Sequence, residues 1–406
     1  MTIYTPEQIL SLRYRGVRKR TEQLCAPLSV EDHVPQPMTD VSPPKWHLGH
    51  VTWFFEQFVL LPNLPGFAAF DPRYAYLFNS YYNAMGDRVA RAERGHLSRP
   101  TVAEVLAYRA HVDAAMNQLL LQPLAADVAE LIELGLQHEQ QHQELLVTDI
   151  KYILGTQPLA PVYDPRGLGV LDVAAEHDGT CPPLDDWVDV AAGTVEVGHS
   201  GRSFAFDNES PKHAVLLGAS QLRRTLVTNQ EYLAFMADGG YERHEFWHAE
   251  GWDWVRTLIR KAPLYWQPDG CGGWQHYTLA GLQALERMAP VSHVSYYEAF
   301  AFCQWAGWRL PTEFEWEAAA TRFKWGRRWE WTQSSYLPYP GFRRSPGAVG
   351  EYNGKFMVNQ QVLRGSSYAT PPGHARLTYR NFFNTPARWQ FTGIRPARDP
   401  GQQAQA

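Results

Sequence analysis

Residues 131–153 read LIELGLQHEQQHQELLVTDIKYI and contain two histidines, His138 and His142, four positions apart. Apolar residues recur through this stretch at helical spacing, and neither Gly nor Pro stands between the two histidines. At 3.6 residues per turn both imidazoles lie on one face of a helix, and its apolar face must pack against other elements. The stretch therefore predicts one long helix of a bundle, with a histidine pair that can bind one metal ion.

A second histidine pair opens another apolar helical stretch, in Trp46-His47-Leu48-Gly49-His50. One histidine from this facing helix would complete a site of three imidazoles, and the Gln and Glu residues that follow the first pair can support such ligands from behind. Three neutral imidazoles with open positions suit iron, copper or zinc, so the ligands alone do not identify the metal.

Two other classes of function fit these residues. The string from His138 to His142 also matches the His-Glu-x-x-His pattern of zinc hydrolases, in which Glu139 would act as general base on metal-bound water. Such enzymes also need a third ligand, commonly downstream, and no ligand-rich helical segment follows soon after Glu144. In the second alternative the chain is a non-catalytic ligand-binding module with structural histidines.

The chain is predicted to be α+β, with a helical first domain over residues 1–155. Four stretches are long enough for the arms of an antiparallel four-helix bundle, and Thr101 is a plausible helix start: Pro6–Cys25, Pro44–Leu61, Thr101–Leu121 and Asp127–Leu154. The long loop 62–100 between the second and third helices is rich in aromatic residues and predicts a functional segment rather than disorder.

The composition of the sequence changes after residue 155. Gly, Pro and Asp residues predict a linker over 156–186, and short strands and turns predict a second domain over 187–400, followed by a polar tail, 401–406. Two helices are expected in this half, near Asn229–Met236 and Tyr296–Ala306.

Composition limits the partners of the chain. Its 406 residues are 45% hydrophobic and carry a formal charge of -5, a balance that favours a soluble globular protein and neither nucleic acid nor a membrane surface as partner. The first residues lack a secretory pattern and no apolar run approaches the ~20 residues of a membrane span, so a cytoplasmic protein is expected. The four cysteines are scattered and indicate neither a disulfide framework nor a thiolate metal site. The oligomeric state is left open.

Several strings in the second half resemble the formylglycine-generating-enzyme fold, a C-type-lectin-like architecture. They are Val227-Thr228-Asn229-Gln230-Glu231-Tyr232, Val294-Ser295-Tyr296-Tyr297-Glu298-Ala299, Arg309-Leu310-Pro311-Thr312-Glu313, Trp329-Glu330-Trp331-Thr332 and Val362-Leu363-Arg364-Gly365-Ser366-Ser367. Where the enzymes that name this fold have two reactive cysteines, this chain has Thr370 and Ala375. The resemblance therefore implies the fold without that cysteine chemistry.

A DinB-like bundle with the motif His-x3-His-x-Glu, fused to such a domain, resembles the ergothioneine-pathway sulfoxide synthases and the closely related selenoneine synthases. Leu77-Phe78-Asn79-Ser80-Tyr81-Tyr82 and Tyr379-Arg380-Asn381-Phe382-Phe383 are similar to that family. The resemblance implies a nonheme Fe(2+) ion held by His50, His138 and His142, with His47 as a neighbour rather than a ligand. It also implies an O2-dependent oxidoreductase that joins sulfur or selenium to the imidazole C2 of hercynine.

The resemblance extends to the substrate residues. Tyr81 or Tyr82 is the expected proton or electron donor, and Gln141 is expected to contact the bound imidazole. The trimethylammonium group of hercynine is expected near Tyr352, Asn381 and Phe382, since an aromatic face suits a quaternary cation. Arg88, Arg91 and Arg94 are candidates for the carboxylate of the second substrate. That donor is left open between cysteine, gamma-glutamylcysteine and a selenosugar.

Overall fold

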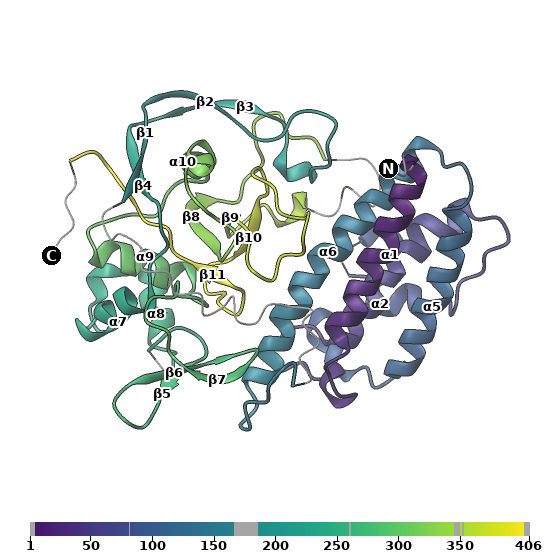
Figure 1. Ribbon diagram of the computed structural model, residues 1–406, viewed down its shortest axis with the longest axis horizontal. Helices are drawn as coiled ribbons and strands as arrows, with labels where there is room; N and C mark the ends of the chain where they lie inside the picture. The colour runs from purple at the N-terminus through teal and green to yellow at the C-terminus, as the bar shows by residue number, and fades with distance from the viewer. Residues whose placement is uncertain are drawn as a thin grey trace. The chain divides into compact units, whose positions relative to one another are not determined.

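The structure is a computed structural model that describes residues 5–80, 82–165, 186–259, 261–344, 350 and 353–401. The chain forms two compact units (Figure 1). The first comprises residues 1–171, 347–352 and 369–374, and the second comprises 172–346, 353–368 and 375–406. Residues 369–374 thus bring the C-terminal half of the chain back to the first unit. Residues 166–185 of the predicted linker lie outside the described residues.

Four long helices build the first unit, as the apolar periodicity predicted (Figure 1). They are α1 (Pro6–Cys25), α2 (Pro44–Phe54), α5 (Val102–Leu119) and α6 (Ala126–Gly155). The Thr101 side chain accepts a hydrogen bond from the Glu104 backbone N–H, and the Glu104 carboxylate accepts one from the Thr101 backbone, so the predicted helix start is a reciprocal cap.

The second predicted helix is not regular throughout. It was expected to run without a break from Pro44 to Leu61, whereas α2 passes into a π-helical turn, Phe55–Leu60, before α3 (Leu61–Asn63). Pro62 in α3 supplies a reason: proline has no N–H to donate and its ring crowds the carbonyl four residues earlier, so a wider turn relieves the conflict.

Helix α6 packs against α1 and α2, and one glycine sets how closely. A Cβ at Gly135 would lie 2.7 Å from the Phe55 ring and 2.8 Å from the Phe54 ring. Only glycine allows this approach, so a residue that slightly weakens the helix in the sequence is required by the packing. The close approach brings the histidine-bearing faces of α2 and α6 together.

The long loop between α2 and α5 has short elements of its own and a buried centre. It contains α4 (Tyr74–Leu77) and two 3-10 turns, Asn83–Met85 and Arg91–His96. Phe78, Asn79, Ser80 and Tyr82 are all buried. The loop is therefore part of the folded unit.

The second unit combines small sheets with short helices, which confirms the predicted α+β class. Its main sheet has the order β10-β9-β8-β11, with β8 (Trp329–Ser335) antiparallel to β9 (Gln360–Gly365), β10 (Asn381–Asn384) antiparallel to β9, and β11 (Thr392–Gly393) parallel to β8. The other sheets are β1-β4-β12 (Trp187–Val190, Ser220–Arg223, Ala397–Arg398), β2-β3 (Gly193–Val197, His213–Leu217) and β5-β6-β7 (Trp266–Pro268, Trp274–Thr278, Gly281–Ala284).

Both helices predicted in this half are present, as α7 (Asn229–Ala237) and α9 (Tyr296–Trp305). Two further helices, α8 (Ala249–Val255) and α10 (Glu313–Ala319), were not predicted. Each has seven residues, which is too short to show a clear helical period in the sequence.

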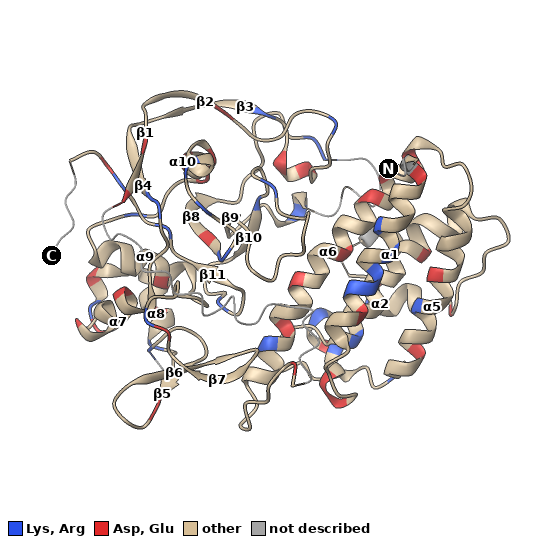
Figure 2. Cartoon of the chain, in the orientation of Figure 1, with Lys and Arg blue, Asp and Glu red and all other residues tan. Residues whose placement is uncertain are grey.

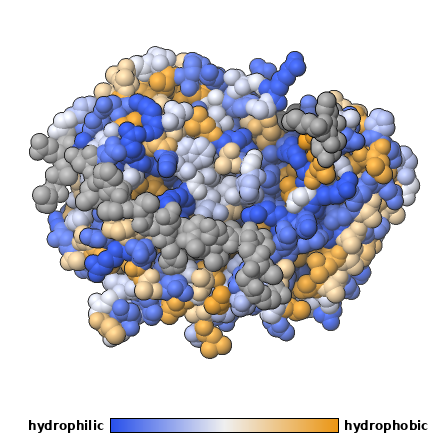
Figure 3. Space-filling model, in the orientation of Figure 1, coloured by the Kyte–Doolittle hydropathy of each residue, from blue (hydrophilic) through white to orange (hydrophobic). Residues whose placement is uncertain are grey.

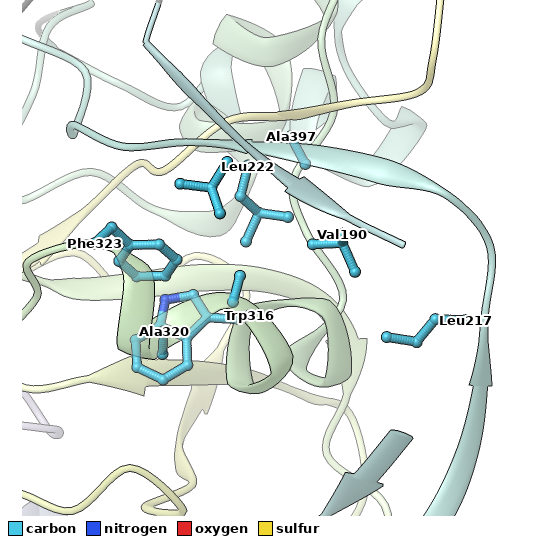
Figure 4. Close-up of a cluster of buried hydrophobic side chains, with 9 residues drawn as sticks. Val190, Leu217, Leu222, Trp316, Ala320, Phe323 and Ala397 are labelled. Carbon is cyan, nitrogen blue, oxygen red and sulfur yellow. The ribbon is translucent and has the colours of Figure 1, made fainter. Parts of the chain in front are cut away.

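A hydrophobic cluster lies between α10 and the sheet β1-β4-β12 (Figure 4). Trp316 and Phe323 pack there with Val190, Leu222 and Ala397. Full burial of side chains of this size contributes about 1.5–3 kcal/mol each. Trp316 is therefore a core residue.

Buried ion pairs account for several of the arginine and glutamate positions in the quoted strings. Arg364 pairs with Glu317, and Arg380 donates to both carboxylate oxygens of Glu313 at 2.8 and 2.9 Å. Arg364, Arg380 and Glu313 are each at most 2% exposed. These buried ion pairs thus stabilise the irregular fold of the second unit.

Along the cartoon in Figure 2, basic and acidic residues are interspersed in both units. Hydrophilic and hydrophobic residues are likewise interspersed over the face in Figure 3. Among the described residues, no helix is long and apolar enough to cross a membrane.

Candidate metal centre

Three imidazoles meet where α2 packs against α6. His50 comes from α2, and His138 and His142 come from successive turns of α6. One ligand nitrogen from each lies within 4.8 Å of the others, and the ring centroids are 4.7 to 5.0 Å apart. Within the described part of the chain, this is the group of His, Cys, Asp and Glu residues that can hold a metal ion. The structure therefore brings together the three histidines that the resemblance selected.

The His50 ring has its tautomer fixed by the loop after α3. Its Nδ1 lies 2.7 Å from the Phe78 carbonyl oxygen, and a carbonyl only accepts, so Nδ1 carries the proton and Nε2 keeps its lone pair. Phe78 reaches this place because residue 49 is glycine: a Cβ there would lie 2.2 Å from the Phe78 ring. Gly49 thus helps to orient its neighbour.

All three imidazoles are held in the neutral form. Burial lowers the pKa of His138 to about 4, and burial together with the neighbouring His138 lowers the pKa of His50 and of His142 well below the ordinary value. A metal ion binds the neutral imidazole, so protons compete weakly for this site near pH 7. A trio of neutral nitrogen donors fits iron, copper or zinc.

A segment from the C-terminal half of the chain covers the adjacent face of α6. In residues 369–374, which we call the strap, Thr370 donates to the Glu144 carboxylate at 2.7 Å and His374 Nδ1 donates to Gln137 Oε1 at 2.8 Å. Gln140 Nε2 also donates to the Pro372 carbonyl, at 3.3 Å. Positions 137, 140 and 144 share one face of α6, next to that of the histidines. Thr370, which stands at a reactive-cysteine position of the resembled fold, serves here in docking.

Comparisons with known proteins agree with this arrangement. The DinB superfamily model matches residues 13–146, and the sulfatase-modifying factor enzyme 1-like domain matches 174–328. The hercynine oxygenase of Mycolicibacterium smegmatis is 29% identical over 88% of this chain and 91% of its own length, and that of Mycobacterium tuberculosis is 28% identical over 88% and 91%. The chain is a homologue of the hercynine oxygenases. The family resemblance and the two-part fold predicted from the sequence are thereby confirmed.

The second half of this hercynine oxygenase homologue also has separate relatives. The formylglycine-generating enzyme of Bos taurus is 31% identical over 37% of this chain and 45% of its own length. The match covers little more than a third of this chain, and the family model for this kind of domain matches residues 174–328, outside the helices that carry the histidines.

The position of Glu139 contradicts the zinc-hydrolase alternative. Its carboxylate is fully buried and accepts hydrogen bonds from Thr21 at 2.6 Å, Arg109 at 2.7 Å and Arg18 at 2.9 Å. Burial acts to raise its pKa, but Arg109, Arg18 and the Thr21 hydroxyl hold the pKa at about 2. The glutamate is one residue, or about 100°, around the helix from His138 and is occupied by the α1 and α5 side chains. It is a structural anion of the bundle and not a base for metal-bound water.

Of the two candidate tyrosines, the structure describes Tyr82. It is buried, and its ring lies 5.5 Å from that of Trp53, which in turn stacks on His50 at 5.8 Å. Tyr82 is thus one aromatic ring removed from the histidines. Tyr81 and Tyr352 lie outside the described residues.

The three loop arginines differ in their surroundings. Arg94 is buried with its guanidinium 3.4 Å above the Trp46 ring, and it donates to the hydroxyls of Ser42 and Ser80. Arg88 is exposed and donates to the Ser80 carbonyl at 2.5 Å. Arg91 is half-buried and donates to a backbone carbonyl, that of Asp40, at 2.6 Å. The loop therefore does not present three equivalent arginines.

Arg94 takes part in a stack behind the site. Trp46, on which Arg94 lies, stacks on His50 with ring centroids 4.6 Å apart and an interplanar angle of 12°. The sequence analysis gave Arg94 as a candidate for the carboxylate of the second substrate, and the structure places its buried side chain in the wall of the histidine site. The sequence does not show this burial of the loop.

The remaining predicted residues lie on α6 and β10. Gln141 is half-buried and directly precedes His142, on the side of α6 between the histidines and the strap. In the second unit, Asn381 Oδ1 accepts from the Phe382 backbone N–H at 2.9 Å, and the Phe382 ring stacks on Tyr336 with centroids 4.1 Å apart. One face of the Phe382 ring is therefore covered by another aromatic ring.

Proposed function

We propose that this chain is a nonheme iron enzyme that uses O2 to join sulfur or selenium to the imidazole C2 of hercynine. The observation that carries the proposal is the three-histidine cluster in a chain that aligns over most of its length with hercynine oxygenases. The reaction class is that of ergothioneine or selenoneine biosynthesis.

In this proposal His50, His138 and His142 hold a ferrous ion, whose chemistry is the activation of O2. The protein supplies orientation and the exclusion of water. His50 and His138 are buried, and all three imidazoles are neutral, so protons compete weakly for the site. Gln141, beside His142, binds the substrate imidazole so that its C2 carbon faces the second substrate.

The other groups bind the ends of the two substrates. Asn381, Phe382 and Tyr352 receive the trimethylammonium group of hercynine. Arg88 and Arg91 bind the carboxylate of the second substrate, and Arg88 in particular is exposed enough to meet it. Arg94, whose guanidinium lies on the Trp46 ring, is the third candidate for this carboxylate.

With a thiol donor the reaction balances as follows. The C2–H and S–H bonds break, the C2–S bond forms, one oxygen atom of O2 stays on sulfur as a sulfoxide, and the other leaves as water. Tyr82 or Tyr81 would be the proton or electron donor of this reaction. The second substrate, which donates the sulfur or selenium, is cysteine, gamma-glutamylcysteine or a selenosugar.

The test is an aerobic incubation of ferrous-loaded protein with hercynine and each donor in turn, followed by mass spectrometry. We expect a hercynine adduct that needs O2, and the productive donor separates the sulfur reaction from the selenium reaction. His138→Ala should abolish the adduct, whereas His111→Ala, an exposed histidine of α5, should not. Binding of hercynine without an adduct for any donor would favour the non-catalytic module.

Single hydroxyl deletions test the proton donor. Tyr82→Phe and Tyr81→Phe each remove one hydroxyl and keep the ring. We expect one of them to lower the rate by about 10²–10⁴-fold, the usual contribution of a positioned acid. Equal, near-parental rates in both variants would exclude the tyrosine pair from the reaction.

A further inference from the structure

A fourth histidine, which is buried, connects the cluster to a carboxylate. The His47 Nδ1 atom lies 2.9 Å from Nδ1 of His142, and its Nε2 atom lies 3.0 Å from Oδ2 of Asp149. Both His47 and Asp149 are at most 3% exposed. The three side chains form a chain of hydrogen bonds that leads from the metal-binding cluster into the bundle.

The helices place these residues in register. His47 precedes His50 by three residues on α2, and Asp149 follows His142 by seven residues, two turns, on α6. Each therefore shares the face of a cluster histidine. The i,i+7 relation of His142 and Asp149 is the sequence signal for this carboxylate.

The direction of each hydrogen bond follows from the partners. Asp149 Oδ2 accepts from the Ser42 backbone N–H at 2.8 Å, and a carboxylate can only accept. His47 Nε2 therefore donates to Asp149, which leaves a lone pair on Nδ1 of a neutral His47. This lone pair accepts the Nδ1 proton of His142, so the Nε2 lone pair of His142 is free for a metal.

We propose that His47 and Asp149 are positioning residues that fix the tautomer and the ring orientation of His142 and strengthen its Nε2 as a metal ligand. The Phe78 carbonyl fixes the same tautomer in His50, with the proton on Nδ1. A carboxylate behind the ligand adds what a carbonyl does not, a full negative charge that increases the basicity of the imidazole. The inference rests on the proposed metal at the cluster.

Three variants test it, with metal binding as the readout. His47→Leu removes both hydrogen bonds, and His47→Gln keeps one donor and one acceptor in the side chain. Thr148→Val is the control, because Thr148 is equally buried beside Asp149 but donates only to the Glu144 backbone carbonyl. Each is titrated anaerobically with Fe(2+) and with Co(2+), and the visible spectrum of the cobalt form is recorded.

We expect His47→Leu to weaken metal binding by about 10–100-fold, as loss of such partners does, and to change the cobalt spectrum. His47→Gln should recover part of the affinity, and Thr148→Val should bind like the parent. Parental affinity and spectrum in a folded His47→Leu protein would overturn the inference. If that variant does not fold, Asp149→Asn decides in its place, since it keeps the size of the side chain and removes its charge.

The outcome is separable from that of the proposed reaction. A parent protein that binds iron tightly but forms no hercynine adduct contradicts the proposed function alone. Unchanged metal binding in the His47 and Asp149 variants contradicts the positioning role alone. A parent that binds neither metal contradicts both.

Discussion

Replacing Glu139 by Gln tests whether this residue is a structural anion. Gln keeps the size of the side chain but removes the charge that faces Arg18 and Arg109, and its amide N–H groups would point at donors. Breaking a buried ion pair from one side costs about 3–5 kcal/mol. Arg18 and Arg109 retain other acidic partners, Asp113 and Glu22, so we expect about 3 kcal/mol, the lower end of that range.

The assay is thermal unfolding followed by circular dichroism at the helical band. For a unit of this size, about 3 kcal/mol corresponds to a fall in Tm of roughly 6–12 °C. Glu133→Gln is the matched control: Glu133 lies on the same helix, and its pair with Arg13 is partly exposed. Such pairs contribute about 0–1 kcal/mol, so its Tm should fall by at most about 4 °C.

Two results would refute this reasoning. Equal Tm values for Glu139→Gln and Glu133→Gln would show that the buried network does not stabilise the bundle. Loss of metal binding in a folded Glu139→Gln protein would show that the carboxylate acts on the histidine site after all. We expect its metal affinity at 15–20 °C to stay within about threefold of the parent, because the carboxylate has its three partners on α1 and α5.

Three further predictions follow from the packing and charge of the first unit. Gly135→Ala should destabilise the protein by about 1–3 kcal/mol because its Cβ would meet two aromatic rings, while Gly16→Ala, in open space on α1, should stabilise it by about 0.5–1 kcal/mol; denaturant midpoints measure both, and the same sign for the two would contradict the packing argument. In metal-free protein, the unfolded state takes up a proton at residue 138 near pH 6.5, whereas folded His138 takes it up only near pH 4. This residue alone should therefore lower the free energy of unfolding by roughly 3 kcal/mol as the pH drops through this window. Denaturant curves at several pH values check this, and His138→Gln should make the slope shallower; an unchanged slope would be the contrary result. Thr370→Val removes the donor to Glu144 and should cost about 0.5–1.5 kcal/mol and raise the rate of proteolysis within the strap, and resistance equal to the parent's would speak against strap docking.

Local sequence signals were enough for the four bundle helices and for the histidine pair. The spacing of apolar residues gave the four bundle helices, and Thr101 marked the start of one of them, because helical periodicity and capping depend on residues within a turn or two of each other. The same rule put His138 and His142 on one face. Selection of His50 over His47 needed the family resemblance, since both lie on the facing helix.

Only the tertiary structure decided what surrounds those histidines. Three features depend on groups that are brought together from far apart in the chain. They are the ion pairs of Glu139, the contact of Arg94 with Trp46 and the hydrogen bond from His47 to Asp149. Gly135 illustrates the reason: in the sequence it weakens a helix, but in the fold it lets two aromatic rings approach and so sets the spacing of α2 and α6. Periodicity determines which face of a helix a residue occupies. Close packing between distant segments determines which side chain contacts that residue, and hence the residue's protonation state and role.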